Sequence, residues 1–330
     1  MTPPEAPPRV LTVEPHEAGL RLDAFLAARL GTTRVAVRRL LAKGRARLAD
    51  AAGAGARAAS AKGARVAAGA RVVVDAYTPA AEQRPRPAPE LALRVLDEGP
   101  GWIAVDKPPG VAVHPLEEEE EGTLLGALVA AHPEMFGLGE GGLRSAVLHR
   151  LDVDTTGVVL FARDAATWTR LRDAFRVHRV RKRYRALVAG RPPDAARIEA
   201  SLVVARHRPA RVRVLEAAAA ATDPRARRAR LALRTLERFE TGGALGTAAL
   251  LEVDLETGFL HQIRASLAAR GFPVLGDRVY AAGTPAGAAA PRQLLHAAHV
   301  AVDEIDVTSP DPPDLAAALA ALRRGREPAW

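Results

Sequence analysis

Three segments of this 330-residue chain bring together residue types that could perform acid–base chemistry. In the first, Asp152 follows His149-Arg150-Leu151 and precedes Thr155-Thr156-Gly157. A carboxylate close to an arginine and followed by Thr-Thr-Gly is typical of a tight, hydrogen-bonded loop. The apolar run from Val158 to Phe161 comes next, so we expect the loop to enter a buried strand that holds Asp152 rigidly. Taken alone, such an aspartate is more often a residue that caps a turn.

The second segment, residues 181–190, is a strand-like run that contains Tyr184, one of three tyrosines in the chain. Five basic residues surround Tyr184 between Arg179 and Arg185, and Lys182 is one of them. A tyrosine in this setting can stack on a base or exchange a proton. As a bare pattern, it is more often a core residue of the strand.

The third segment runs from Glu256 to Arg264. A strand-to-helix turn at Thr257-Gly258 would place Gln262 and Arg264 near a site. An arginine beside a carboxylate keeps that carboxylate ionised and fixes its conformation. The competing interpretation is a surface helix whose arginine meets only solvent.

Short β-like runs and helical patterns alternate irregularly after residue 92, which predicts an α+β domain rather than regular βαβ winding. The β-like runs are Leu93–Leu96, Trp102–Val105, Val158–Ala162, Tyr184–Val188, Ala249–Leu255 and His299–Val302, and the helical patterns are Thr123–Ala131, Ala165–His178 and His261–Arg270.

The first part of the chain predicts a small basic module. Helical spacing from Leu20 to Leu41 is interrupted at Gly31-Thr32-Thr33, which predicts two helices followed by short strands. Guanidinium groups on one face of the second helix and on the next strand would suit phosphate groups. These groups belong to Arg34, Arg38, Arg39, Arg45 and Arg47.

Charge and composition suggest the domain boundaries. Residues 1–90 carry +7 of the net charge of +9, as expected of a polyanion-binding module, although a solvated arginine-rich surface would give the same excess. Four prolines lie between residues 78 and 89, which predicts an extended linker. The expected order is a disordered leader (1–15), the basic module (16–77), the linker (78–92) and the α+β domain (93–330).

The chain contains no cysteine, which excludes disulfides, thiolate metal sites and cysteine nucleophiles. No stretch approaches the roughly 20 apolar residues of a membrane helix. The proline-rich N-terminus with Glu5 does not resemble a signal peptide, so we expect a cytoplasmic protein. No two histidines have the usual spacing of metal ligands, and we expect no metal site.

The basic module resembles the S-four domain, a small RNA-binding module named after a ribosomal protein. The resemblance covers roughly residues 19–77. It rests on Arg21-Leu22-Asp23-x-Phe25-Leu26, Thr33-Arg34, Leu40-Leu41-x-x-Gly44, and Gly69 before a valine-rich strand. It implies that Arg34, Arg38, Arg39 and Arg45 contact RNA.

The α+β domain resembles the RluA-like, large-subunit type of pseudouridine synthases over about residues 93–315. The family motif H-R-L-D-x-x-T-S-G matches His149–Gly157, K-x-Y matches Lys182–Tyr184, and T-G-R-T-H-Q-I-R matches Thr257–Arg264 with Phe259 and Leu260 in place of Arg and Thr. Further agreement lies in Asp106–Gly110, Val113–Pro115, Gly271–Tyr280 and Leu294–Ala297, with Phe272 and Ser266 standing in place of usual histidines. These departures bear on the choice of RNA more than on the chemical step.

The resemblance implies a cofactor-free isomerisation of uridine to pseudouridine in ribosomal or transfer RNA, by an enzyme with a mixed, mainly antiparallel sheet. Asp152 matches the essential aspartate, Arg264 its ion-pair partner, and Tyr184 the tyrosine that stacks on uracil and is a candidate base. Arg150 matches a residue that helps to hold the flipped-out site open. We expect further RNA contacts from Thr155, Lys182, His261 and Gln262, and a monomer suffices for this activity.

Three alternatives belong to other classes of protein. A catalytically silent RNA-binding or ribosome-assembly factor would share the basic module but would not need Asp152, Tyr184 and Arg264 together. A metal-dependent hydrolase would need a fuller ligand set than the histidines offer. A glycosidase could use Asp152 and Asp154, but its two carboxylates must flank the scissile bond.

Overall fold

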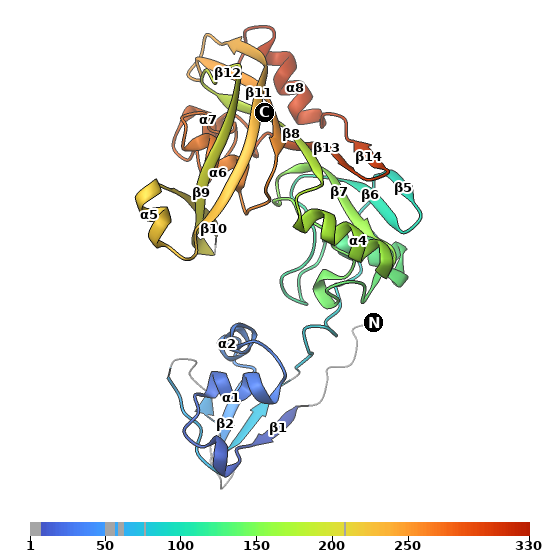
Figure 1. Cartoon of the computed structure of the whole chain (residues 1–330), viewed down its shortest axis with the longest axis vertical. Coiled ribbons are helices and arrows are strands. Elements are labelled where there is room, and N and C mark those ends of the chain that lie inside the picture. The colour runs from blue at the N-terminus through green and yellow to red at the C-terminus, as the bar shows by residue number, and fades with distance from the viewer. Residues whose placement is uncertain (1–7, 50–56, 59–62, 76, 208) are drawn as a thin grey trace. The chain divides into compact units, whose positions relative to one another are not determined.

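The computed structural model describes residues 8–49, 57–58, 63–75, 77–207 and 209–330. The chain divides into two compact units, residues 1–84 and 85–330, which we call the N-terminal unit and the C-terminal unit (Figure 1). The division falls inside the stretch 78–92, where the sequence predicts a linker.

The N-terminal unit packs two helices on a small antiparallel sheet of order β1-β4-β2-β3. Thr33 caps the second helix, because its side-chain oxygen accepts a hydrogen bond from the amide of Ala36. Apolar side chains of both helices, Phe25 and Leu40 among them, are buried against the sheet. The elements are β1 (Arg9–Thr12), the 3₁₀ turn η1 (Pro15–Glu17), α1 (Leu22–Arg29), α2 (Arg34–Ala42), β2 (Ala46–Ala49), β3 (Arg57–Ala58) and β4 (Arg71–Val74).

Strand β1 corrects the prediction of a disordered leader over residues 1–15. Its four residues pair antiparallel with β4. Leu11 packs against the core and Val13 is buried within it, so the alternation of apolar residues anchors this segment. Residues 1–7 of the predicted leader lie outside the described residues.

The C-terminal unit is built on one long mixed sheet of order β10-β9-β11-β12-β8-β13-β7-β6-β5, with β14 paired to β13 (Figure 1). Neighbouring strands are antiparallel except β13 and β7, which are parallel. The predicted α+β class with a mainly antiparallel sheet is therefore confirmed. The strands are β5 (Val95–Gly99), β6 (Trp102–Lys107), β7 (Thr156–Ala162), β8 (Arg181–Ala189), β9 (Ala195–His207), β10 (Ala210–Leu215), β11 (Arg227–Glu240), β12 (Thr247–Leu255), β13 (Leu295–Val302) and β14 (Ile305–Thr308).

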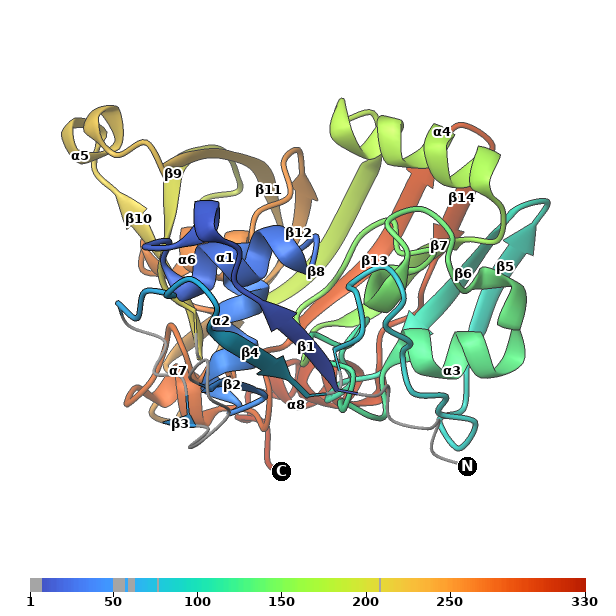
Figure 2. The ribbon, with the colours of Figure 1, turned by 90° about the horizontal axis from the view of Figure 1, so that it is seen from below.

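Helices cover both faces of this sheet, which explains why its central strands are apolar on both sides. The α-helices are α3 (Leu124–Ala131), α4 (Ala165–Arg176), α5 (Ala217–Thr222), α6 (Gln262–Ala268), α7 (Pro285–Ala288) and α8 (Pro313–Leu322), and the 3₁₀ turns are η2 (Pro133–Met135) and η3 (Gly142–Arg144). Figure 2 shows α3 and α4 on opposite sides of the half formed by β5, β6, β7, β13 and β14. None of the described helices is long and apolar enough to span a membrane.

Alternate residues of the central strands belong to different cores. In β8, Tyr184 and Ala186 share a core with residues of α6. Leu187, between Ala186 and Val188, shares a core with residues of α7 and α8 on the other face. The face of β8 that carries Tyr184 is thus the face covered by α6.

The sequence did not predict β9, β10 or β11. In β11, buried residues such as Ala229, Leu231 and Leu233 alternate with exposed or half-buried ones, several of them arginine. The alternation is that of a strand, but long arginine side chains replace the usual β-branched residues and weaken the signal.

Gly157 lies where the parallel strands β7 and β13 pair with each other. Its φ is +112°, and a Cβ added there would lie 2.2 Å from the carbonyl oxygen of Ala297 in β13. Both the backbone conformation and the contact therefore require glycine.

We expect Gly157→Ala to lower the free energy of unfolding of the C-terminal unit by roughly 3 kcal/mol or more, because the strain at positive φ, itself about 1–3 kcal/mol, adds to a backbone clash. Gly137→Ala is the matched control: φ is +85° but open space surrounds the added Cβ. Denaturant unfolding of both variants checks this, and equal losses would contradict the importance of the β7–β13 contact.

Candidate active site

A buried arginine joins two carboxylates at the centre of the candidate site. Arg264 of α6 is 4% exposed. Its Nη1 donates to Oδ2 of Asp152 at 2.8 Å, and its Nε and Nη2 donate to the two carboxylate oxygens of Asp277 at 2.7 and 2.9 Å. The predicted ion pair between Asp152 and Arg264 is therefore present, and the structure adds Asp277 behind it.

Asp277 fixes the position of Arg264 from the interior. Its side chain is fully buried, and its Oδ1 also accepts hydrogen bonds from the backbone amides of Val279 and Tyr280. Burial alone would raise the pKa of Asp277, but the hydrogen bond and charge of Arg264 outweigh it and lower the pKa. Asp277 is thus ionised, and its Oδ1 is anchored to the backbone as well as to Arg264.

The charge on Arg264 is equally secure. Burial disfavours the guanidinium charge, but the hydrogen bonds and charges of Asp277 and Asp152 outweigh burial and raise the pKa of Arg264. Asp152 is the more accessible of the two carboxylates, because 21% of its side chain is exposed, against none for Asp277. The site therefore presents one carboxylate to solvent from a rigid, charged support.

His261 and Tyr280 lie beside this pair. His261 precedes α6 with a left-handed backbone (φ +51°), and its Nε2 is 3.9 Å from Oδ2 of Asp152. Its Nδ1 is 3.0 Å from the hydroxyl of Tyr280, which also accepts a hydrogen bond from the amide of Val212. Burial lowers the pKa of His261 despite the charge of Asp152, so the ring is neutral near pH 7.

Tyr184 comes from the adjacent strand β8 and is 7% exposed. Burial raises the pKa of its phenol above the usual range, and the negative charge of Asp152 raises it further. The hydroxyl therefore stays protonated at neutral pH.

Lys182 lies two residues earlier in β8, on the same face as Tyr184. Its ammonium is 3.8 Å from the point where a Cβ of Gly258 would stand, so β8 and the turn before α6 meet here. Burial lowers the pKa of Lys182 to about 8. Burial lowers the pKa of the nearby His149 to about 3, and the charge of Lys182 contributes to this decrease. The Nε2 atom of His149 accepts a hydrogen bond from the amide of Leu160.

Lys107, at the end of β6, fixes the loop that carries Asp152. Its side chain is completely buried, and its ammonium donates to the carbonyls of Pro108 (2.8 Å), Val111 (2.8 Å) and Val153 (2.6 Å). These three acceptors match the three donors of a lysine ammonium. Burial lowers the pKa of Lys107 to about 7, while the nearby carboxylates of Asp154 and Asp152 oppose this decrease.

The remaining residues predicted to contact RNA in this unit fall into two groups. Arg150 is exposed on the surface. Thr155 and Gln262 are each only 2% exposed. Gln262 uses its amide group to hold the turn before α6, through Thr257, the amide of Phe259 and the carbonyl of Arg230. The structure gives Thr155 and Gln262 supporting contacts within the protein, and their contact with RNA stays a prediction.

In the N-terminal unit, three of the arginines around α1 and α2 converge on one carboxylate. Arg21, Arg34 and Arg38 all donate to the buried side chain of Asp23, at 3.1–3.2 Å. Their hydrogen bonds lower the pKa of Asp23 to about 2 even though burial opposes them. The guanidinium groups of Arg34 and Arg38 remain about half exposed.

Arg39 lies exposed on the surface of α2, and Arg45 immediately precedes β2. Of the five arginines predicted from the sequence, Arg34 and Arg38 thus contact Asp23, and Arg47 pairs with Asp75.

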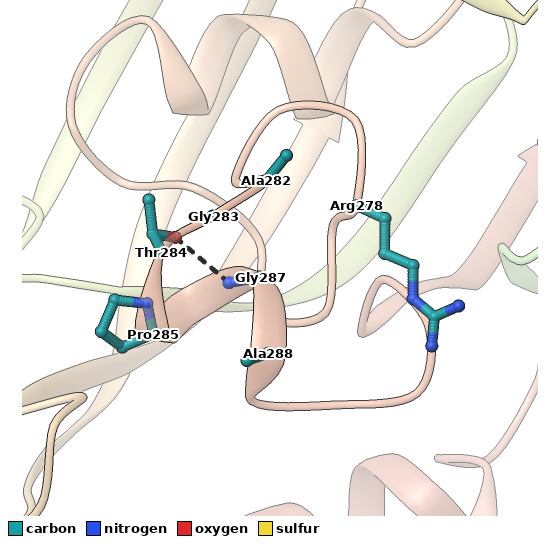
Figure 3. A pocket seen from close by; sticks show the side chains of 7 residues that line it. All are labelled: Arg278, Ala282, Gly283, Thr284, Pro285, Gly287 and Ala288. Carbon is teal, nitrogen blue, oxygen red and sulfur yellow. Dashed lines mark hydrogen bonds between the residues drawn. The ribbon is translucent and has the colours of Figure 1, made fainter.

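A hollow of about 490 Å³ lies apart from this chemistry (Figure 3). It is lined by Arg278 and by the small residues around the start of α7, where the amide of Gly287 donates to the Thr284 hydroxyl. It contains no carboxylate and none of the residues predicted for the site.

Sequence reasoning missed two residues of the site. Asp277 lies in the motif Gly271–Tyr280, but no role was assigned to it from the sequence. Its place as a carboxylate in an apolar run close to Arg264 in sequence could have indicated one. Lys107 could have been found from its rarity, since it is one of four lysines and follows directly on an apolar strand. A buried lysine at such a position must find acceptors.

Comparison with known proteins agrees with this geometry. The family model described as RNA pseudouridylate synthase matches residues 101–269. A protein of Chloroflexus aurantiacus named as an RNA pseudouridine synthase is 35% identical over 97% of this chain and 95% of its own length. Ribosomal large subunit pseudouridine synthase D of Nitrosomonas europaea is 34% identical over 72% of this chain and 67% of its own length.

The fold also has solved counterparts. The structure of Human RNA Pseudouridylate Synthase Domain Containing 1 superposes with a TM-score of 0.55, at 22% identity, over 74% of this chain and all of that one. This likeness concerns the fold alone. From the family model and the extent of its sequence relatives, the chain belongs to the RluA-like family of RNA pseudouridine synthases.

Proposed function

We propose that this enzyme converts uridines of large-subunit ribosomal RNA to pseudouridine, with Asp152 as the catalytic carboxylate. The observation that carries the proposal is the chain of contacts from Asp152 to Arg264 to Asp277. It offers a single partly exposed carboxylate whose charge and direction are set by a buried cation. A carboxylate that must act at the ribose needs both properties.

The reaction breaks the bond between N1 of uracil and C1′ of ribose, turns the base, and forms a bond from C5 to C1′. The proton on C5 leaves, and N1 gains one, so the product is an isomer of the substrate. Whether Asp152 adds to C1′ or removes the C2′ proton, it acts as an anion, and the buried guanidinium of Arg264 supplies the opposite charge beside it. The uridine must leave the RNA stack to reach Asp152.

Tyr184 suits contact with the uracil ring. It lies on the same face of the sheet as α6, and its ring is rigidly packed in the core shared with that helix. Because its pKa is raised, its hydroxyl serves better as a neutral hydrogen-bonding group than as a resting base. Removal of the C5 proton by Tyr184 would require simultaneous transfer of the phenolic proton to another acceptor.

The N-terminal unit supports an RNA substrate. Asp23 holds the guanidinium groups of Arg21, Arg34 and Arg38 together, and these carry a net excess of two positive charges over the carboxylate. Half-exposed guanidinium groups held at fixed spacing suit phosphate oxygens. We propose this arginine group, with Arg39 and Arg45, as the RNA contact of the unit.

The substrate is tested by tritium release from RNA labelled at C5 of uridine, since forming the C5–C1′ bond expels that hydrogen. We expect release from unmodified large-subunit ribosomal RNA and little from a transfer RNA pool. Release from transfer RNA alone would contradict the proposed substrate. Tight RNA binding without release from either pool would favour the silent RNA-binding factor.

Asp152→Asn is expected to lower the single-turnover rate by at least roughly a thousandfold, because the amide cannot act as an anion. Asp154→Asn, in the same loop, is the matched control and is expected to keep most of the rate. An equal loss in both variants would instead favour a pair of carboxylates acting together.

The affinity for RNA is expected to weaken roughly tenfold as pH rises from 7 to 9, because Lys182, with a pKa of about 8, loses the charge that attracts phosphate. Lys182→Arg keeps its positive charge over this pH range, so its affinity for RNA is expected to change less with pH than that of the wild-type protein. Fluorescence anisotropy at constant salt measures both proteins, and titration of the RNA itself is common to them. Parallel curves would remove Lys182 from the RNA contact.

A further inference from the structure

Besides Lys107, the segment of residues 292–297 holds the loop after Asp152 at several points. Thr156 and Gly157 pair in parallel with His296 and Ala297, and the Thr156 hydroxyl is 2.9 Å from Nδ1 of His296. One residue earlier, the hydroxyl of Thr155 lies 3.5 Å from Nε2 of Gln293. The contacts continue towards Asp152 through a residue that no part of the mechanism uses.

That residue is Arg292, which is 6% exposed. Its Nη1 donates to the carbonyl of Asp154 at 2.9 Å, and also to the carbonyl of Gln293 at 2.8 Å. The preceding carbonyl of the loop, that of Val153, accepts from Lys107. Two buried cations from separate elements therefore hold two consecutive carbonyls immediately after Asp152.

Arg292 is itself oriented by Asp314, near the start of α8. Its Nε and Nη2 donate to the two oxygens of Asp314 at 2.6 and 2.7 Å. This bidentate geometry fixes the plane of the guanidinium and directs its remaining nitrogen to the loop. Without Asp314, Arg292 would be a buried cation with only carbonyl partners.

Helix α8 lies away from the catalytic face. Its buried residues Leu315, Leu319 and Leu322 share a core with Leu187 of β8, whereas Tyr184 and α6 share the core on the opposite face. Asp314 contacts neither Asp152 nor Arg264 among the described hydrogen bonds and ion pairs. Any effect of Asp314 on the site must pass through Arg292.

The same segment also contacts the other end of the ion-pair chain. Gly276 precedes Asp277, has a φ of +77°, and leaves only 1.9 Å between an added Cβ and the carbonyl oxygen of Arg292. The amide of Leu294 donates to the carbonyl of Leu275 at 2.8 Å. The backbone at Arg292 thus lies against the segment that supports Arg264, while its side chain holds the loop of Asp152.

We infer that Arg292 is a positioning residue for the catalytic carboxylate, and that Asp314 of α8 sets its orientation from the far side of the sheet. The inference rests on the proposed role of Asp152. An ångström of displacement at a catalytic group can cost roughly a hundredfold in rate. When Arg292 no longer holds the carbonyl of Asp154, Asp152, two residues earlier, becomes free to move by such a distance. The RNA-binding surfaces stay unchanged.

The test uses Asp314→Asn in the full chain. We expect the single-turnover rate at saturating RNA to fall ten- to a hundredfold while the RNA dissociation constant stays within twofold of wild type. Hydrogen–deuterium exchange should become faster in the peptide covering residues 152–156, where the amide of Thr155 donates to the carbonyl of Asp152. Asp314→Glu restores a carboxylate and should recover most of the rate.

Arg323→Gln is the matched control. Arg323 follows α8 and pairs with Glu237 of β11 at the surface, so its loss weakens another attachment of the helix without touching the loop. We expect wild-type rate and wild-type exchange at residues 152–156 for this variant. Arg292→Lys gives a second route if Asp314→Asn fails to fold, because it keeps a charge but cannot bond to both Asp314 oxygens and the loop together.

Three results would overturn the inference: loop exchange in Asp314→Asn equal to that of wild type, faster exchange with an unchanged rate, or the same losses in Arg323→Gln. An inactive wild-type chain would contradict the proposed function. In that case, the exchange measurement alone would still support or overturn the hold of Asp314 and Arg292 on the loop.

Discussion

Arg264 donates hydrogen bonds from two of its nitrogens to Asp277 and from the third to Asp152, and the geometry of the site depends on this arrangement. A buried guanidinium with one carboxylate would be neutralised within the interior. With two carboxylates, the group carries one net negative charge, and the carboxylate of Asp152 is the more exposed of the two. Removing one partner of a buried ion pair typically costs about 3–5 kcal/mol, so the three side chains stabilise one another as well as the site.

The fold supplies the partners of this group from distant parts of the chain. Asp152 precedes β7, and Tyr184 lies in β8, which is separated from β7 by β13 in the sheet. Arg264 belongs to α6, which packs on the face of β8 that carries Tyr184. Helices on both faces keep the central strands dry, so that hydrogen bonds and ion pairs near their ends are strengthened. The parallel contact of β7 with β13, possible only with glycine at position 157, fixes the direction in which the loop enters the sheet.

Local patterns predicted two elements of the C-terminal unit well, one because it is uniformly apolar and the other because its apolar residues recur at helical spacing. The helical pattern at Ala165–His178 and the strand at Val158–Ala162 correspond closely to α4 and β7. The pairing of Asp152 with Arg264 followed from resemblance, since 112 residues separate them and no local pattern joins them. Asp277, Lys107 and Arg292 were not assigned roles, because the need for buried charges to find partners shows only once burial is known. Strand β1 was missed because it is four residues long and mostly exposed, and its partner β4 lies about 60 residues later in the sequence.

The order of the contacts along the chain has a consequence for biosynthesis. The loop of Asp152 is completed by β13 and Arg292, some 140 residues later, and Arg292 is oriented by α8 near the last residues. Contacts of such long sequence separation form late in folding. A nascent chain can therefore fold its N-terminal unit first, well before the contacts that hold the loop of Asp152 are made. Synthesis thus separates the folding of the N-terminal unit from the completion of the candidate site.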